Sequence, residues 1–402
     1  MRILWVKVGG LWPPDTGGRL RSLHMIAELS RRHQITVVTT HAPNEDPRAL
    51  EARLPECRGI DSIPCALPKQ GTPGFAFGLA TSWMSPYPAD LWRWRLPRVR
   101  EQVQRRLTEP VDLCVADFLV AVPNLPARPA APVVLFEHNV EYMIWKRLHD
   151  VEQRPWRRAL LAMEWRKMRR YESRACRRVA RTIAVSEEDR ALLAAVAPTA
   201  NIRSVSTGVD TQFYHPNGTP EAAATLVFTG SMDWYPNEDA MLHFIDSILP
   251  AIRREIPGVS LTVVGRNPTE RIRAAGAAAG VEVTGTVADI RPFVAKAAVY
   301  VVPLRVGGGT RLKIFEALAM GKAVVATGVG AEGLPVIAGE HYLRADTPQE
   351  FARSVVTLLK DPSHRLALGT AGRRLVEARY SWAEVAREFE ALCQEVLPLR
   401  AR

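Results

Sequence analysis

The chain has 402 residues and a formal net charge of +11, and 47% of its residues are hydrophobic and 24% charged. This length accommodates two ordinary domains, and the composition is typical of a globular protein. No apolar run approaches the ~20 residues that span a bilayer, the five scattered cysteines never form a C-x-x-C pair, and the apolar N-terminus is too short for a signal peptide. These features argue against a membrane-spanning segment and a structural zinc site, and they predict a cytoplasmic protein.

The N-terminal part of the sequence reads as a strand, a loop, a helix and a second strand. Residues 3–8 and 35–40 are short apolar or β-branched runs, and residues 19–32 place apolar side chains at helical spacing. Further strands are predicted at 111–118, 132–138 and 182–186. A buried strand, a helix and another buried strand form a βαβ unit, so we expect a parallel sheet.

The same alternation restarts after residue 222. Strands are expected at 226–231, 261–265, 281–285, 299–304 and 323–327, with helices at 237–258, 269–280 and 288–297. The predicted fold class is α/β, with two doubly wound (Rossmann-like) parallel-sheet domains facing a central cleft. The expected domains are 1–210 and 211–379, followed by a C-terminal helix within 380–402 that packs back on the N-terminal domain.

A glycine-rich segment follows the predicted strand at 299–304. It consists of Gly307, Gly308, Gly309 and Thr310. Free amides at a helix start, together with the helix dipole, can bind an anion, and Arg311 and Lys313 add positive charge. Glu316, one turn further on, can accept hydrogen bonds from two adjacent hydroxyls, as on a ribose. The alternative is a flexible turn with a surface ion pair between Lys313 and Glu316.

Two more candidate sites follow predicted strands of the first domain. Gly17 and Gly18 open the first predicted helix, where they can face a phosphate or simply allow tight packing. His138 follows the strand at 132–138, between Glu137 and Glu141. A histidine there can donate to a substrate hydroxyl or act as an acid or base, and the alternative is a cap on the following helix.

Two stretches, 91–107 and 154–181, combine tryptophan with many arginines. They are consistent with a patch that rests on an anionic membrane surface, and equally with packed helices that have a basic outer face. No nucleic-acid-binding module is recognisable, so we expect no nucleic-acid partner.

These motifs, taken in order, make the chain resemble the family 4 retaining glycosyltransferases of the GT-B fold. The resemblance covers most of the chain. It rests on the Gly17–Gly18 loop, AVSEED (184–189), STGVDTQFYHP (206–216), VTGTVADIRPFVAKAAVYVVPL (283–304), GGGTRLKIFEALAMGKAVVAT (307–327) and SWAEVAREFE (381–390). The segments 230–240 and 307–313 are similar to a branch associated with bacterial surface polysaccharide and exopolysaccharide assembly.

The resemblance implies a nucleotide-sugar donor, a glycan or lipid-linked acceptor and retention of anomeric configuration. Glu316 matches the family glutamate that holds the donor ribose, and Gly17 and Gly18 match the loop facing the donor phosphates. His138 is similar to the cleft histidine near the transferred sugar. Gly230 belongs to the donor site, and residues 283–287, including Val287, are expected to contact the base through the backbone.

The chain departs from the family pattern at two places. Gly308 occupies the position of the first glutamate of the E-x7-E motif, and residues 230–240 lack the usual Arg and Lys that hold the diphosphate. We expect Arg311 and Lys313, with the amides of 307–310, to neutralise the diphosphate instead. No D-x-D pair is placed to hold a divalent ion, so the expected transfer needs no metal and no cofactor.

Two other functions stay open at this point. A nucleotide-sugar epimerase can share the same architecture, although a cluster of acid and base carboxylates is not evident. A non-catalytic basic protein that binds polysaccharide or nucleic acid would also account for the charge.

Overall fold

The computed structural model describes residues 1–14, 16–68, 71–306 and 312–398. The chain divides into two compact units. Unit 1 contains residues 1–206 and 385–402, and unit 2 contains residues 207–384. These boundaries lie within a few residues of the expected divisions at 210 and 380.

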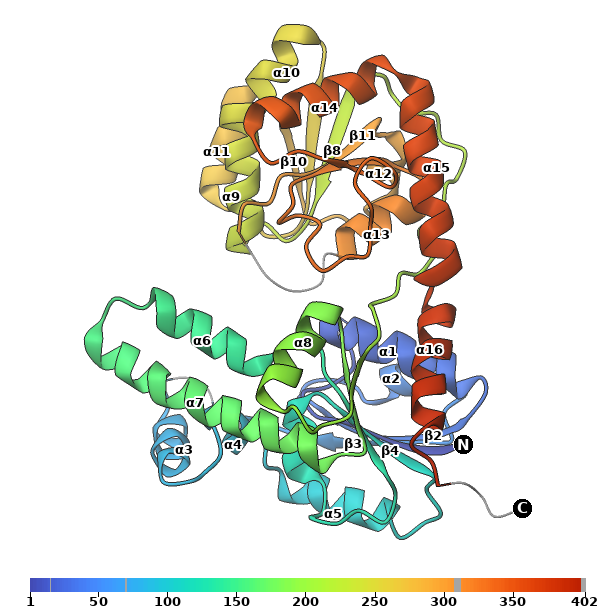
Figure 1. The fold of residues 1–402 in the computed structure, drawn as a ribbon. Helices are drawn as coiled ribbons and strands as arrows, with labels where there is room; N and C mark the ends of the chain where they lie inside the picture. Colours follow the sequence, from blue (N-terminus) through green and yellow to red (C-terminus); the bar gives the residue numbers. More distant parts are fainter. Residues whose placement is uncertain (15, 69–70, 307–311, 399–402) are drawn as a thin grey trace. The chain divides into compact units, whose positions relative to one another are not determined.

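Unit 1 is built on a seven-stranded parallel sheet in the order β3-β2-β1-β4-β5-β6-β7 (Figure 1). The strands are β1 (Arg2–Lys7), β2 (Gln34–His41), β3 (Gly59–Pro64), β4 (Leu113–Asp117), β5 (Val133–Phe136), β6 (Arg181–Ala184) and β7 (Ile202–Ser204). The helices are α1 (Gly17–Ser30), α2 (Arg48–Glu51), α3 (Pro73–Trp83), α4 (Ala89–Arg93), α5 (Pro97–Arg106), the 3-10 helix η1 (Leu119–Asn124), α6 (Glu141–Val151), α7 (Pro155–Arg178) and α8 (Glu187–Val196). The continuous apolar strands of the sequence are buried on both faces, as parallel strands require.

The alternation of side chains along β1 shows how both faces of this sheet are covered. Leu4 and Val6 belong to the apolar cluster that includes residues of α5, η1 and α7. Trp5 points to the other face, where its ring centroid lies 5.9 Å from Phe136 and 5.8 Å from Phe389 of the C-terminal helix α16 (Trp382–Gln394). Helix α16 therefore contributes part of the core of unit 1.

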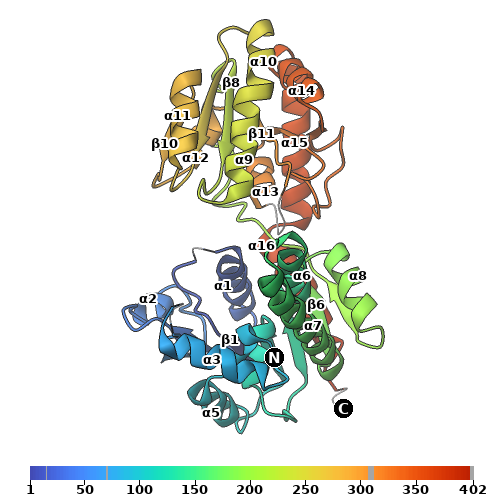
Figure 2. The ribbon, with the colours of Figure 1, turned by 90° about the vertical axis from the view of Figure 1, so that its left-hand side faces the viewer.

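Unit 2 has a six-stranded parallel sheet in the order β10-β9-β8-β11-β12-β13. The strands are β8 (Thr225–Thr229), β9 (Ser260–Val264), β10 (Glu282–Gly285), β11 (Val299–Val302), β12 (Ala323–Ala326) and β13 (Leu343–Arg344). The helices are α9 (Tyr235–His243), the π-helix η2 (Phe244–Ile248), α10 (Leu249–Glu255), α11 (Glu270–Ala279), α12 (Arg291–Lys296), α13 (Leu312–Ala319), α14 (Pro348–Lys360) and α15 (Pro362–Arg379). Figure 2 shows helices on both sides of this sheet.

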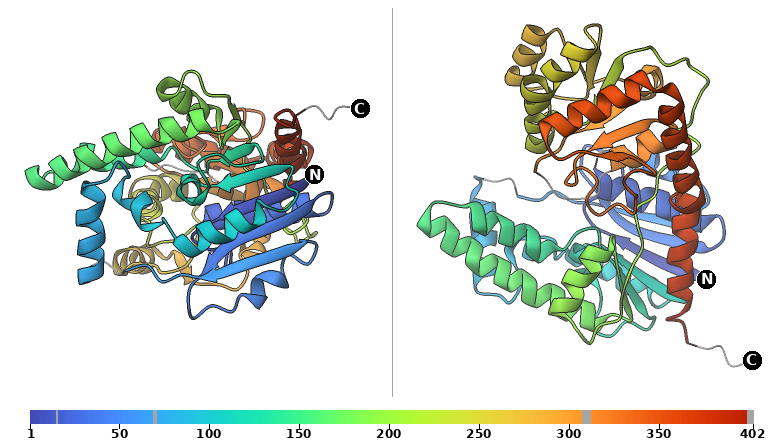
Figure 3. Two further views of the ribbon diagram at one scale, coloured as in Figure 1. Left: turned by 90° about the horizontal axis from the view of Figure 1, so that it is seen from below. Right: turned by 45° about the horizontal axis from the view of Figure 1, so that its top comes forward.

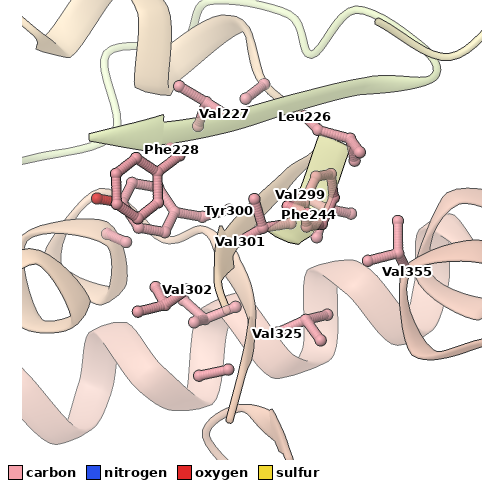
Figure 4. Packing of buried hydrophobic residues seen from close by; sticks show 14 of the residues in the cluster. Leu226, Val227, Phe228, Phe244, Val299, Tyr300, Val301, Val302, Val325 and Val355 are labelled. Carbon is pink, nitrogen blue, oxygen red and sulfur yellow. The ribbon is translucent and has the colours of Figure 1, made fainter. Parts of the chain in front are cut away.

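The core of unit 2 lies between the central strands and the helices that cover them. Val227 and Phe228 of β8 point to opposite faces of the sheet, and both belong to one buried apolar cluster with Val301, Val325, Phe244 and Val355 (Figure 4). The expected single helix over 237–258 is instead interrupted by η2, which ends directly before Leu249 and Pro250. Proline has no amide hydrogen to donate, and a π-helical turn accommodates that gap in the helical ladder.

Candidate functional site

The strand order of unit 1 reverses between β1 and β4, and ligands of doubly wound sheets bind at the carboxyl ends of strands at such a point. Three polar side chains meet there. Lys7 is the last residue of β1, Asp117 is the last of β4, and His138 follows β5. All three are buried, and they lie far apart in the sequence.

Asp117 is the centre of this group. Its carboxylate accepts hydrogen bonds from the Trp5 indole N–H at 2.7 Å, from Lys7 Nζ at 3.1 Å and from His138 Nε2 at 2.8 Å. Burial opposes the charge on Asp117, but the positive charge of Lys7 and then the interaction with His138 hold its pKa well below the usual range. Asp117 is therefore ionised, and it can only accept hydrogen bonds.

This contact determines the protonation state of His138. Burial, followed by the charge of Lys7, lowers the pKa of His138 to about 3, so the ring is neutral at physiological pH. Because the hydrogen on Nε2 is donated to Asp117, the other nitrogen, Nδ1, carries a lone pair. Nδ1 is buried and has no hydrogen-bond partner among the described residues. The atom that His138 offers to a ligand is thus an acceptor, whereas the sequence favoured a donor or an acid–base group.

The alternative role of His138 as a helix cap is wrong. Val140 is the N-cap of α6, and it makes no side-chain cap hydrogen bond. The Glu172 carboxylate instead accepts from the amides of Glu141 at 2.8 Å and Tyr142 at 3.0 Å. His138 is therefore available for another role.

Phe118 and Gly18 hold the His138 ring in place. The Phe118 ring stacks on the imidazole with centroids 4.4 Å apart, and the Phe118 backbone has a φ of +78°, a region that residues with side chains rarely adopt. A Cβ placed on Gly18 would lie 2.9 Å from Phe118 Cε2 and 3.6 Å from His138 Nδ1. Glycine at position 18 is thus required by the close approach of α1 to these two rings, as the packing interpretation proposed.

Gly17 is the first residue of α1. Thr16 is the N-cap, and its side chain accepts from the amide of Arg19. The guanidinium of Arg19 donates to the carbonyls of Gly9 and Pro13, and that of buried Arg21 donates to the carbonyls of Glu137 and Val205. These two arginines therefore tie loops of unit 1 together.

Glu137 lies close to Glu172 of α7, among buried groups. Burial, and then the electrostatic interaction with Glu172, raise the pKa of Glu137 well above its usual value, and burial likewise raises the pKa of Glu172. The environment of this pair thus favours the uncharged form of Glu137.

The strand order of unit 2 reverses between β8 and β11, and Gly230 directly follows β8. Lys313 of α13 reaches this point. Its Nζ donates to Asn237 Oδ1 at 2.8 Å and lies 4.1 Å from the ring centroid of Phe228. A Cβ on Gly230 would lie 2.8 Å from Lys313 Nζ and 2.8 Å from Asn237 Nδ2, so only glycine fits there without a shift of these groups.

Glu316 is on the same helix, one turn after Lys313. It is half-buried, and burial raises its pKa, although the hydrogen bond from the Tyr214 hydroxyl and the charge of Lys313 oppose this shift. Tyr214 thus orients the carboxylate. Val287 follows β10, and its side chain packs against the core of unit 2.

Five predicted site residues lie outside the described residues. They are Gly307, Gly308, Gly309, Thr310 and Arg311. The predicted phosphate loop is therefore represented in the structure only by its continuation from Leu312.

Several residues of these two sites were missed in the sequence. They are Trp5, Lys7, Asp117, Tyr214, Asn237 and Arg266. The Arg266 guanidinium donates to the Ser231 hydroxyl at 2.8 Å. The sequence could have indicated Lys7, Asp117 and Arg266 as site residues, since each is a charged residue at or just after the end of a buried apolar strand. Across the described ranges, three or more His, Cys, Asp or Glu side chains nowhere gather so that they could hold a metal ion, and no described helix is long and apolar enough to cross a membrane.

Comparison with known sequences places both units in one group of enzymes. The family model described as "Glycosyltransferase Family 4" matches residues 16–213, and that described as "Glycosyl transferases group 1" matches residues 223–361. A GDP-mannose-dependent alpha-(1-6)-phosphatidylinositol monomannoside mannosyltransferase of Mycobacterium tuberculosis is 29% identical over 222 residues, covering 48% of this chain and 55% of that protein. The phosphatidyl-myo-inositol mannosyltransferase of the same species is 28% identical over 190 residues, covering 45% and 49%. The chain thus spans about half the length of the curated relatives it matches.

Solved structures show the same fold. Sucrose-phosphate synthase from Thermosynechococcus elongatus has a TM-score of 0.68 at 18% identity, over 98% of both chains. Anabaena HepE in complex with UDP has a TM-score of 0.65 at 14% identity, over 98% of this chain and 100% of that one. With both units covered by models of the same group, the chain has the GT-B fold and belongs to the family 4 glycosyltransferases.

Proposed function

We propose that the chain transfers a sugar from a nucleotide-sugar donor to a lipid-linked or glycan acceptor with retention of configuration, in polysaccharide or glycoconjugate biosynthesis. The observation that carries the donor half is the group at the carboxyl end of β8, where Lys313 of α13 lies beside Gly230 and Glu316 follows one turn later on the same helix. A lipid-linked acceptor is supported by the two mycobacterial relatives, which are mannosyltransferases named for phosphatidylinositol-based acceptors.

In this proposal Glu316 accepts hydrogen bonds from the ribose hydroxyls of the donor. Its orientation by Tyr214 and its proximity to Lys313 suit this role, because both oppose the effect of burial and favour the ionised carboxylate. Lys313 neutralises charge that develops on the departing diphosphate. Arg266, which follows β9, is a second cation at the carboxyl edge of the same sheet.

His138 acts on the sugar or acceptor side of the reaction. Its unpartnered Nδ1 lone pair accepts a hydrogen bond from a hydroxyl, while Asp117 keeps the hydrogen on Nε2. A buried acceptor without a partner costs roughly 1–3 kcal/mol, so a hydroxyl that satisfies it gains affinity in the same range. We propose that Lys313, Arg266 and the amides of 307–310 stabilise the leaving diphosphate, and that the transfer needs no metal ion.

The first test is a thermal-shift panel of UDP, GDP, dTDP, ADP and CDP. A nucleotide present at 100 times its Kd stabilises the folded state by about 2.7 kcal/mol, or roughly 5–10 °C in Tm for a domain of this size. Glu316→Ala should abolish the shift. Glu255→Ala is the matched control, since Glu255 is exposed and pairs with Lys360. A parent protein that no nucleotide stabilises would contradict a donor site in unit 2.

The reaction itself is tested with the donor that carries the stabilising base. Transfer should persist in EDTA, and NMR of the anomeric proton should show the donor configuration in the product. Lys313→Met should lose transfer, whereas Lys360→Met, a surface control, should not. Loss of transfer in EDTA that is restored by a divalent ion would refute the metal-independent mechanism.

A further inference from the structure

Helices α6 and α7 of unit 1 form an antiparallel hairpin, which Figures 1 and 3 show extending away from the sheet of that unit. Its base is fixed by the Glu172 carboxylate, which accepts from the first amides of α6, and by the Ser173 hydroxyl, which donates to the carbonyl of Val196. Its middle is tied to neighbouring segments, since Lys167 Nζ donates to the Ser82 carbonyl at 2.8 Å and Glu164 accepts from the Ala89 amide at 2.8 Å. The hairpin is thus held in its inner half.

The outer half exposes large apolar side chains. Ile144, Leu148 and Val151 follow one another at helical spacing along α6, and Val151 is 70% exposed. Trp156, in the first turn of α7, is 62% exposed. An exposed apolar stripe and an exposed tryptophan are costly in water, and such surfaces usually mark a binding site.

The hairpin also carries most of the net positive charge of the chain. Residues 141–178 contain twelve Lys and Arg against five Asp and Glu, a net charge of +7 out of the +11 of the whole protein, and residues 144–158 contribute +3 of this, from five Lys and Arg against Asp150 and Glu152. Arg154, Arg157 and Arg158 are exposed and flank Trp156, and the Arg157 guanidinium lies 5.4 Å from the Trp156 ring centroid. Glu164 and Glu172 are buried and accept backbone amides, so they offset little of this surface charge.

The other tryptophan and arginine stretch, 91–107, is used differently. Leu91, Val99 and Val103 are buried in the core of unit 1. Arg95 stacks on Trp92, and Arg106 pairs with Asp61 at 2.7 Å. Its apolar side chains therefore pack against the protein, and the structure does not favour this stretch as a membrane surface.

We propose that the outer half of the hairpin, residues 144–158, docks on an anionic lipid bilayer. Tryptophan and aliphatic side chains enter the boundary between headgroups and acyl chains, while the flanking arginines bind lipid phosphates. The charge favours a membrane over a protein partner, because three exposed arginines around an apolar tip complement the negative surface of an anionic bilayer. Such docking would bring unit 1 to a lipid-linked acceptor, and only this last point rests on the proposed function.

The experiment is co-sedimentation of the full chain with vesicles of phosphatidylcholine alone and of phosphatidylcholine with phosphatidylglycerol in equal parts. The tip variant is Val151→Ser with Trp156→Ser, and its control is Ile337→Ser with Leu366→Ser, which are exposed apolar residues of unit 2. The charge variant is Arg154→Gln, Arg157→Gln and Arg158→Gln, and its control is Arg254→Gln, Arg271→Gln and Arg353→Gln, all exposed.

The parent should bind the anionic vesicles, and binding should weaken as salt rises. The charge variant should lose affinity by about 100-fold, from the contribution of each basic residue near an anionic surface. The tip variant should lose at least about tenfold from its missing apolar burial. Both controls should behave as the parent, and all variants should keep the nucleotide-induced thermal shift.

Three results would overturn the proposal. The first is a parent protein that remains in the supernatant with anionic vesicles at low salt, which would leave a protein partner as the occupant of this surface. The second is a tip variant that partitions as its control does. The third is a charge control that loses as much affinity as the charge variant, which would make the binding a general effect of net charge. Because the nucleotide shift is measured on the same proteins, failure of membrane docking is distinguishable from failure of the donor site.

Discussion

Replacing Lys7 by methionine tests whether the ion pair with Asp117 sets the protonation state of His138. Methionine keeps an unbranched side chain at the end of β1 beside the Phe118 ring, over which Lys7 Nζ lies at 4.2 Å from the centroid. The substitution removes a positive charge that lowers the pKa of His138, while the Asp117 carboxylate that raises it remains. The pKa of His138 should therefore rise.

The size of the effect follows from the shared contact with Asp117 Oδ1. Lys7 Nζ and His138 Nε2 lie 3.1 and 2.8 Å from this oxygen, so they are within about 6 Å of each other. Two unit charges about 5 Å apart interact by roughly 3 kcal/mol at an effective dielectric constant of 20, which corresponds to a change of about 2 in pKa. The pKa of His138 should thus move from about 3 in the parent to about 5 in Lys7→Met.

The measurement is ¹⁵N NMR of the histidine rings at pH 5 and pH 7, with His138→Asn to assign the signals. At pH 5 the parent should show the neutral tautomer with hydrogen on Nε2, and the variant should be about half protonated. The transfer activity of the variant should then decrease as the pH is lowered below 5, because protonation of His138 removes the lone pair on Nδ1. Lys146→Met, on the exposed surface of α6, is the control. A neutral His138 at pH 5 in Lys7→Met would refute this account of the site.

Three further substitutions test other parts of the sites. Gly18→Ala places a Cβ 2.9 Å from Phe118 Cε2, so denaturant unfolding should show a loss of about 1–3 kcal/mol, and an unchanged midpoint would contradict the tight packing. Gly230→Ala brings a Cβ within 2.8 Å of Lys313 Nζ, so nucleotide affinity, measured by calorimetry, should fall at least about tenfold. The free energy of unfolding without ligand should change less than it does for Gly18→Ala. An unchanged nucleotide affinity would argue against Lys313 at the donor phosphates. The raised pKa of Glu137 means that the folded state holds a proton that the unfolded state has released above its ordinary pKa of 4.5, so stability should fall as pH rises from about 4.5. Glu137→Gln cannot ionise and should flatten part of that fall in unfolding measurements at pH 5 and pH 8, and equal slopes for the two proteins would argue against a protonated Glu137.

The sequence was sufficient for the repeated strand–helix pattern, because buried parallel strands are continuous apolar runs. It was weaker for β3, β7 and β13. These strands lie at or near the sheet edges, where exposed polar residues such as Arg203 and Arg344 interrupt the apolar pattern. Local periodicity describes burial on both faces well, and it describes a half-exposed strand poorly.

The sequence pointed to His138 and Glu316 as candidate site residues, and it did not predict the side chains that surround them. His138 and Glu316 could be found because each belongs to a motif. The partner that determines the state of His138 is Asp117, whose hydrogen-bonding neighbour Lys7 is 110 positions away. Strand periodicity indicates where a strand ends, but it does not say that β4 lies between β1 and β5, and this order brings the three side chains together.

The two points at which the strand order reverses, between β1 and β4 and between β8 and β11, have a similar arrangement of side chains but a different local charge. In each, a lysine ammonium lies over a phenylalanine ring, 4.2 Å from the Phe118 centroid for Lys7 and 4.1 Å from the Phe228 centroid for Lys313. Lys7 is buried and paired with ionised Asp117, so with neutral His138 the group has no net charge and suits an uncharged hydroxyl. Lys313 donates to a neutral amide beside the bare backbone of Gly230, an arrangement that suits an anion. This contrast supports the proposed division, in which unit 2 receives the diphosphate of the donor and unit 1 contacts hydroxyl groups.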